Sequence, residues 1–108
     1  MNINFDRLIN DLNELSKFGY DEQTRGVNRT VYSPTYKEAV EWLVAKMSDS
    51  GLSTRIDAIG NVIGRLGPVG VPAVVCGSHI DSVPEGGKLD GTLGVLAGLE
   101  VARCISKS

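Results

Sequence analysis

The stretch VPAVVCGSHIDSVPEGGKLDGTLGV (residues 71–95) joins an apolar run, a loop and the start of a helix. The run VPAVVCGSH is of the kind that is buried on both faces of an α/β sheet. After the loop, Leu93, Leu96 and Val101 recur at helical spacing, which predicts a helix over residues 91–105. A buried strand followed by a loop and a helix indicates the α/β class, with helices packed against a mostly parallel sheet.

Two further helices are predicted upstream. Apolar residues at helical spacing in NFDRLINDLNELSKFG predict an amphipathic helix that ends near Gly19. Ser33 is suited to cap a second helix, Pro34 to its first turn and Gly51 to its end. The intervening segment, YDEQTRGVNRTVYS (residues 20–33), has no apolar period and is predicted to be a loop.

Two short strands are expected between the second helix and the apolar run. Leu52, Thr54 and Ile56 alternate with polar neighbours, as in a strand with one face in water. DAIGN then reads as a turn and NVIGRL (residues 61–66) as a second strand. The predicted order is therefore two helices, three strands, a loop and a last helix.

Size and charge restrict the function classes. A chain of 108 residues is typical of one domain, and its net charge of -2 comes without the basic block that nucleic-acid binding needs. The apolar run is too short to span a bilayer, and the N-terminus has no secretory pattern. Cys76 and Cys104 lie in apolar surroundings and form no C-x-x-C pair. These features predict a cytoplasmic protein with reduced cysteines and neither a nucleic-acid nor a membrane partner.

The loop holds the only histidine of the chain close to carboxylates. His79 ends the apolar run, Asp81 follows two residues later, and Asp90 directly precedes the last helix. In open α/β sheets, ligands bind where strand ends and helix N-termini converge. Imidazole and carboxylate are good zinc ligands, and a carboxylate often holds the second ring N–H of a ligating histidine. The pattern is therefore compatible with a metal site in which Asp81 orients His79 and Asp90 bridges two ions.

Other interpretations of the same residues exist. Asp90 is equally well explained as a helix cap, and a single histidine in a short motif is often structural or simply exposed. A hydrolytic triad of Ser78, His79 and Asp81 is disfavoured because neighbouring strand residues point to opposite faces. A phosphate cradle formed by GGKLDG lacks the P-loop spacing and places an acid near the anion.

The segment GSHIDSVPEGGKLDGTLGVLAGLEV (residues 77–101) resembles the metal-binding segment of the M20-type dinuclear amidohydrolases. It is most similar to the hydantoinase/carbamoylase branch, which contains N-carbamoyl-L-amino-acid hydrolases and allantoate amidohydrolases. Residues 26–66 resemble the helix–strand–strand segment that precedes the motif in that family. The resemblance implies that residues 1–108 are the N-terminal portion of a zinc-peptidase-like catalytic domain, a partial three-layer sandwich.

The resemblance also implies roles for individual residues. His79 would ligate one metal, Asp90 would bridge both, and Asp81 would be the catalytic-site carboxylate that orients His79. The metals would be zinc or manganese, two in a complete site, and they would polarise the carbonyl of a small ureido or amide substrate. An N-carbamoyl-L-amino acid and allantoate are about equally plausible substrates. Asn61 would be structural.

Members of that family are several times longer than this chain. Their further ligands, their general base, and the second domain that supplies substrate contacts and the dimer interface have no counterpart here. We therefore expect an inactive fragment that binds metal weakly, since catalytic zinc sites generally need three protein ligands. The end of the chain, ARCISKS, within or just after a helix, favours a fragment. An exposed apolar face would favour self-association, as in a homodimer.

Two alternatives to an inactive fragment remain. The chain is either a small non-enzymatic domain that binds its own copy or a partner chain, or a fragment that regains activity when the missing part is supplied.

Overall fold

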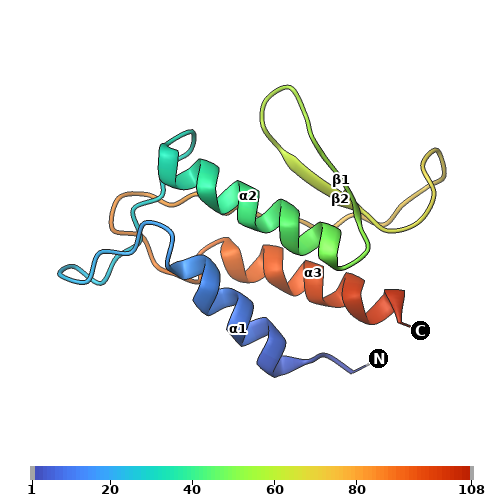
Figure 1. The fold of residues 1–108 in the computed structure, drawn as a ribbon, viewed down its shortest axis with the longest axis horizontal. Coiled ribbons are helices and arrows are strands. Elements are labelled where there is room, and N and C mark those ends of the chain that lie inside the picture. The colour runs from blue at the N-terminus through green and yellow to red at the C-terminus, as the bar shows by residue number, and fades with distance from the viewer. Residues whose placement is uncertain (1, 108) are drawn as a thin grey trace.

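The computed structural model describes residues 2–107 and contains three helices and one pair of strands (Figure 1). Along the chain the elements are α1 (Phe5–Ser16), α2 (Pro34–Asp49), β1 (Ser53–Ile56), β2 (Val62–Arg65) and α3 (Thr92–Ser106). The two helices expected on either side of residues 20–33, the two short strands after them and the last helix are confirmed. No helix in this described range is long and apolar enough to cross a membrane.

Side-chain caps begin the first two helices. The carboxamide of Asn4 accepts a hydrogen bond from the Arg7 N–H at 3.0 Å, and the Ser33 hydroxyl accepts one from the Tyr36 N–H at 3.1 Å. Pro34 occupies the first turn of α2, where its missing N–H costs no helical bond. The boundaries of both helices thus follow from local sequence.

The strands β1 and β2 form an antiparallel hairpin, in which Ser53 is paired with Arg65 and Ile56 with Val62. The Asp57 carboxylate closes the turn by accepting hydrogen bonds from the backbone N–H groups of Gly60 and Asn61 and from the Asn61 side chain at 2.9 Å. These bonds stabilise the ionised carboxylate, so hydrogen bonding from Asn61 lowers the pKa of Asp57. The structural role expected for Asn61 is therefore a turn contact.

The predicted third strand does not form within residues 2–107. Residues 71–79 belong to no sheet, and the side chains of Val74 and Val75 are fully or largely exposed. The described sheet has only two strands, and they are antiparallel because a turn of a few residues joins them. A parallel pair requires a longer crossover connection. The expectation of a mostly parallel sheet in three layers is therefore not met by this part of the molecule.

The core lies where the three helices meet, and one residue that directly follows residues 71–79 joins it. Apart from the helix residues, the apolar cluster contains Ile80, which is 5% exposed. In Figure 1 helices α1 and α3 lie side by side, with the hairpin on the far side of α2. The helical members of the cluster are Leu12, Leu15, Ala39, Leu43, Leu96 and Leu99.

Two buried acids link α1 to α3. Glu100 accepts two hydrogen bonds from the Arg7 guanidinium, at 2.7 and 2.6 Å, and Asp11 accepts one from Arg103 at 2.5 Å. The hydrogen bonds from Arg7 lower the pKa of Glu100 to about 2. A polar layer therefore reinforces the packing of the first helix on the last.

Candidate metal centre

The structure brings His79, Asp81 and Asp90 together. Nδ1 of His79 lies 3.2 Å from Oδ1 of Asp81, and Nε2 lies 3.6 Å from Oδ2 of Asp90. The loop between residues 81 and 90 therefore returns Asp90 to the second nitrogen of the ring. The imidazole is half exposed and the Asp90 carboxylate is largely exposed, so both are accessible from solvent.

The surroundings of the imidazole favour one of its two neutral tautomers. Nδ1 faces two acceptors, the Asp81 carboxylate and the Asp81 backbone carbonyl oxygen at 3.1 Å. Neither group can donate a hydrogen bond when the carboxylate is ionised, and both lie closer to Nδ1 than the 3.6 Å that separates Nε2 from the Asp90 carboxylate, so we assign the proton of the neutral ring to Nδ1. This leaves the lone pair of Nε2 on the side of Asp90, which is the arrangement that a metal-ligating histidine uses.

Packing explains why these side chains meet. Ile80 is buried in the core, and so the chain directs its two neighbours, His79 and Asp81, away from it. Gly91 has a φ of 76°, and a Cβ there would lie 2.5 Å from His79 Nδ1. The close return of the loop thus requires glycine at position 91.

Two of the alternative interpretations are wrong. The N-cap of α3 is Gly91, and no side chain caps this helix, so capping does not account for Asp90. Ser78 packs against α3, where a Cβ on Gly94 would lie 2.9 Å from the Ser78 Cβ. No hydrogen bond between Ser78 and His79 is formed among the described residues, and the Ser–His–Asp triad is therefore not assembled.

A segment that holds the loop in place was not predicted from the sequence. Val27 and Gly86 exchange backbone hydrogen bonds at 2.8 and 2.9 Å, and the Asn28 side chain accepts one from the Glu85 N–H at 2.8 Å. These contacts come from residues 20–33, the polar stretch that was predicted only to be a loop. A glycine at position 26 is the one local sign, since a Cβ there would lie 2.6 Å from the Glu85 Cα.

The donor set suits a divalent metal but is incomplete. One imidazole nitrogen and one carboxylate belong to the ligand types of both zinc and manganese. Within residues 2–107 no group of three or more histidine, cysteine, aspartate or glutamate side chains could hold a metal ion. The residues present can therefore contribute to such a centre without enclosing it.

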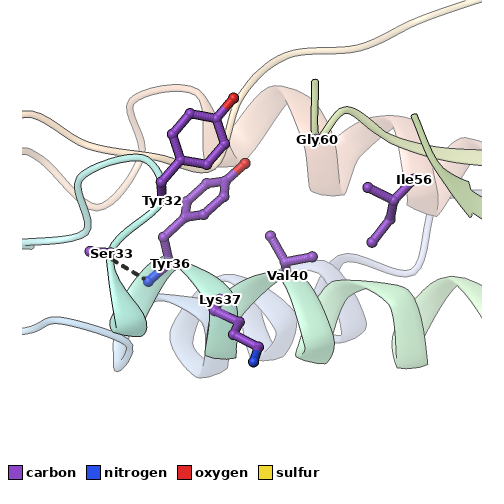
Figure 2. Close-up of a pocket in the computed structure, with 7 residues that line it drawn as sticks. All are labelled: Tyr32, Ser33, Tyr36, Lys37, Val40, Ile56 and Gly60. Carbon is purple, nitrogen blue, oxygen red and sulfur yellow. Dashed lines mark hydrogen bonds between the residues drawn. The ribbon is translucent and has the colours of Figure 1, made fainter. Parts of the chain in front are cut away.

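A separate hollow of about 270 Å³ lies between α2 and the tip of the hairpin (Figure 2). Burial raises the pKa of Tyr36 in its wall, and the charge of Asp81 acts in the same direction. The hollow is lined by Tyr32, Ser33, Tyr36, Lys37, Val40, Ile56 and Gly60.

Comparisons with known proteins find amidohydrolases that are similar to this chain. The chain is 44% identical over 100 residues to an N-carbamoyl-L-amino-acid amidohydrolase of Paenarthrobacter aurescens, covering 91% of this chain and 24% of that protein. It is 38% identical over 108 residues to a ureidoglycolate hydrolase of Oryza sativa subsp. japonica, covering 98% and 22%. It is also 46% identical over 85 residues to an allantoate amidohydrolase of Escherichia coli (strain K12), covering 77% and 20%. No family model matches.

A solved structure agrees with these relatives. The crystal structure of an amidase of the hydantoinase/carbamoylase family from Burkholderia phymatum superposes with a TM-score of 0.90 at 45% identity. The superposition covers 99% of this chain and 26% of that one. The chain thus spans about a quarter of the length of the proteins that it matches.

Proposed function

The chain is homologous over nearly its whole length to one segment of the hydantoinase/carbamoylase family of amidohydrolases, and from this relationship we propose that it contributes half of a metal centre. The complete enzyme would hydrolyse a C–N bond of a small ureido or amide substrate. The observation that supports this most directly is the position of the imidazole of His79 between two carboxylates.

In this proposal each side chain has its own task. His79 and Asp90 are metal ligands, and Asp81 holds the Nδ1–H so that Nε2 keeps a free lone pair. A bound divalent ion, zinc or manganese, would act as a Lewis acid toward the substrate carbonyl. The exposure of the His79 ring and of the Asp90 carboxylate is consistent with a site that further residues complete.

The remaining ligands and the general base would come from protein outside these 108 residues. We propose that residues 1–108 are the N-terminal part of a catalytic domain and that the isolated chain is inactive, because two ligands are too few for a catalytic metal. In the complete domain residues 71–79 would be a strand of a mostly parallel sheet covered by helices on both faces. The exposed Val74 and Val75 support this placement.

The proposed substrates share a ureido group. The names of the relatives specify N-carbamoyl-L-amino acids, ureidoglycolate and allantoate. We propose a small molecule of this class and a cytoplasmic location, in keeping with a sequence in which Cys76 and Cys104 form no C-x-x-C pair. A homodimer would follow the same family pattern.

A second candidate function is a non-enzymatic domain that binds its own copy or a partner chain. The exposed apolar side chains of residues 71–79 favour it. The two functions differ in the size of the native product. An immunoblot of the source cells should give a band several times heavier than 11.5 kDa if the chain is part of an enzyme, whereas a single band at 11.5 kDa would favour the binding domain.

Activity then provides the decisive assay. The protein purified from its source should release ammonia from allantoate or from an N-carbamoyl-L-amino acid, and His79→Gln and Asp90→Asn should each abolish this activity. Glu85→Gln is the matched control, because it removes a carboxylate from the same loop without a contact to the imidazole. Full activity in the His79→Gln protein would refute the proposed role of that residue.

A further inference from the structure

We propose that Arg29 is a positioning residue for His79, acting through the backbone between His79 and Asp81. This inference rests on the proposed function only in assuming that the orientation of the imidazole matters for metal binding. Arg29 is 1% exposed and is among the largest fully buried side chains described. A buried cation is costly unless its donors are paired, and so its contacts indicate what it is for.

The guanidinium of Arg29 joins two segments that are far apart in the sequence. Its Nε donates to the carbonyl oxygen of Ile80 at 2.7 Å, and Nη1 donates to the carbonyl oxygens of Leu15 and Phe18 at 3.0 and 2.7 Å. The last two oxygens lie at the C-terminal end of α1, where the helix dipole favours a cation. Arg29 therefore ties the peptide group between Ile80 and Asp81 to the end of a core helix.

The backbone of Arg29 fixes the same segment from its other side. The Arg29 N–H donates to the Ser82 hydroxyl at 2.9 Å, and the Arg29 carbonyl accepts from the Ser82 N–H at 2.8 Å. Contacts at Ile80 and Ser82 thus bracket Asp81, the residue that holds Nδ1 of His79. The charge of Asp81 also stabilises the guanidinium, opposing the lowering of its pKa by burial.

Lysine cannot reproduce this arrangement. The three carbonyl oxygens are reached from two different nitrogens of one rigid planar group, whereas a lysine has a single nitrogen on a flexible stem. Arg29→Lys keeps the positive charge but removes the planar guanidinium whose two nitrogens make these hydrogen bonds. The substitution should release the carbonyl of Ile80 and loosen the pairing of His79 with Asp81.

The single histidine of the chain makes the test direct. Long-range ¹H–¹⁵N NMR spectra, recorded well above the ordinary imidazole pKa, report the tautomer of His79 without any metal. We expect the Nδ1–H form to predominate in the unsubstituted chain and Arg29→Lys to give a mixture of the two tautomers. Zn²⁺ titration followed by the same signals should show an affinity about tenfold lower.

Arg7→Lys is the matched control. Arg7 also donates from two nitrogens to buried acceptors, both on Glu100, but it contacts nothing in the 79–90 loop in the described structure. It should lower the thermal unfolding temperature and leave the tautomer of His79 unchanged. If Arg29→Lys does not fold, Ser82→Ala takes its place, since it removes only the hydroxyl contacts with Arg29 and Val27.

An unchanged tautomer in the folded Arg29→Lys chain, or in Ser82→Ala where that variant replaces it, would overturn the inference, as would an equal change in Arg7→Lys. A failure of the proposed metal-binding function would give a different experimental result. In that case Zn²⁺ would leave the His79 signals of every variant unperturbed, while the effect of Arg29 on the tautomer would still be measured.

Discussion

Gly91 lies so close to His79 that a Cβ atom on Gly91 would be 2.5 Å from both Nδ1 and the backbone carbonyl oxygen of His79. The φ of 76° at Gly91 adds a second constraint, because side chains disfavour that region. The imidazole and the start of α3 thus share a space that leaves no room for a side chain on residue 91.

Gly91→Ala should therefore displace the imidazole of His79 and lower the free energy of unfolding by about 2 kcal/mol, through steric overlap and left-handed strain. The His79 NMR signals should shift and the Zn²⁺ affinity should fall. Gly87→Ala is the control, because this glycine of the same loop has open space at its Cβ position. Equal effects of the two substitutions would show that the loop responds to alanine in general.

Asp81→Asn should weaken metal binding on the order of 10- to 100-fold while leaving the fold intact. The backbone carbonyl of Asp81 still accepts from Nδ1, but the carboxylate that makes the ring more basic is lost. Zn²⁺ titration compares this variant with Glu85→Gln, for which we expect the affinity of the unsubstituted chain. An unaltered Zn²⁺ affinity in Asp81→Asn would show that Asp81 does not contribute to metal binding.

Glu100→Gln should destabilise the chain at neutral pH by about 3 kcal/mol, because it leaves the partly buried guanidinium of Arg7 without its charged partner. The pKa of Glu100 is about 2 in the folded chain, below its ordinary value of 4.5. The ionised carboxylate therefore stabilises the fold above pH 4.5, and this contribution disappears as the pH falls toward 2.

Urea unfolding at neutral pH and near pH 3 measures this difference directly. The unsubstituted chain should lose more stability on acidification than Glu100→Gln does. Glu38→Gln, an exposed acid on α2, should retain the acid sensitivity of the unsubstituted chain. Parallel pH profiles for the unsubstituted chain and Glu100→Gln would contradict the assignment.

The isolated chain should self-associate through residues 71–79. The side chains of Val74 and Val75 are exposed to solvent. The backbone of their segment pairs with no described strand, so it is open to pairing with another chain. Val74→Lys should shift the chain toward the monomer in analytical ultracentrifugation. Val69→Lys, at an exposed position in the preceding turn, should not. A monomeric unsubstituted chain at all concentrations would contradict this expectation.

Local signals predicted the helices and the hairpin well. Ser33 and Pro34 mark the start of α2 by short-range hydrogen bonding and ring geometry, and these effects need no distant partner. The alternation at residues 52–56 likewise predicted β1. The apolar run at 71–79 was misjudged because a strand forms only beside another strand, and none lies alongside it in residues 2–107.

The candidate site was only partly predictable. The spacing of His79 and Asp81 predicts their contact, because alternate residues of an extended chain point the same way. The clamp that includes Val27 and Arg29 could not be predicted, since its hydrogen bonds join residues more than fifty positions apart. A polar segment with no regular spacing of apolar residues gives no indication of which distant residues it will bond.

The hydrogen bonds and ion pairs that join the N-terminal segment and α1 to α3 have a consequence for the order of folding. The bonds from Asn4 and Arg7 to Glu100, and from Arg103 to Asp11, span 96, 93 and 92 residues. Loops of that length close slowly, and α1 is too short to be stable by itself. Helix α1 must therefore wait for α3 before it can pack, and Arg29, which is bonded to the end of α1, can hold the segment bearing His79 firmly only after residue 103 has been synthesised.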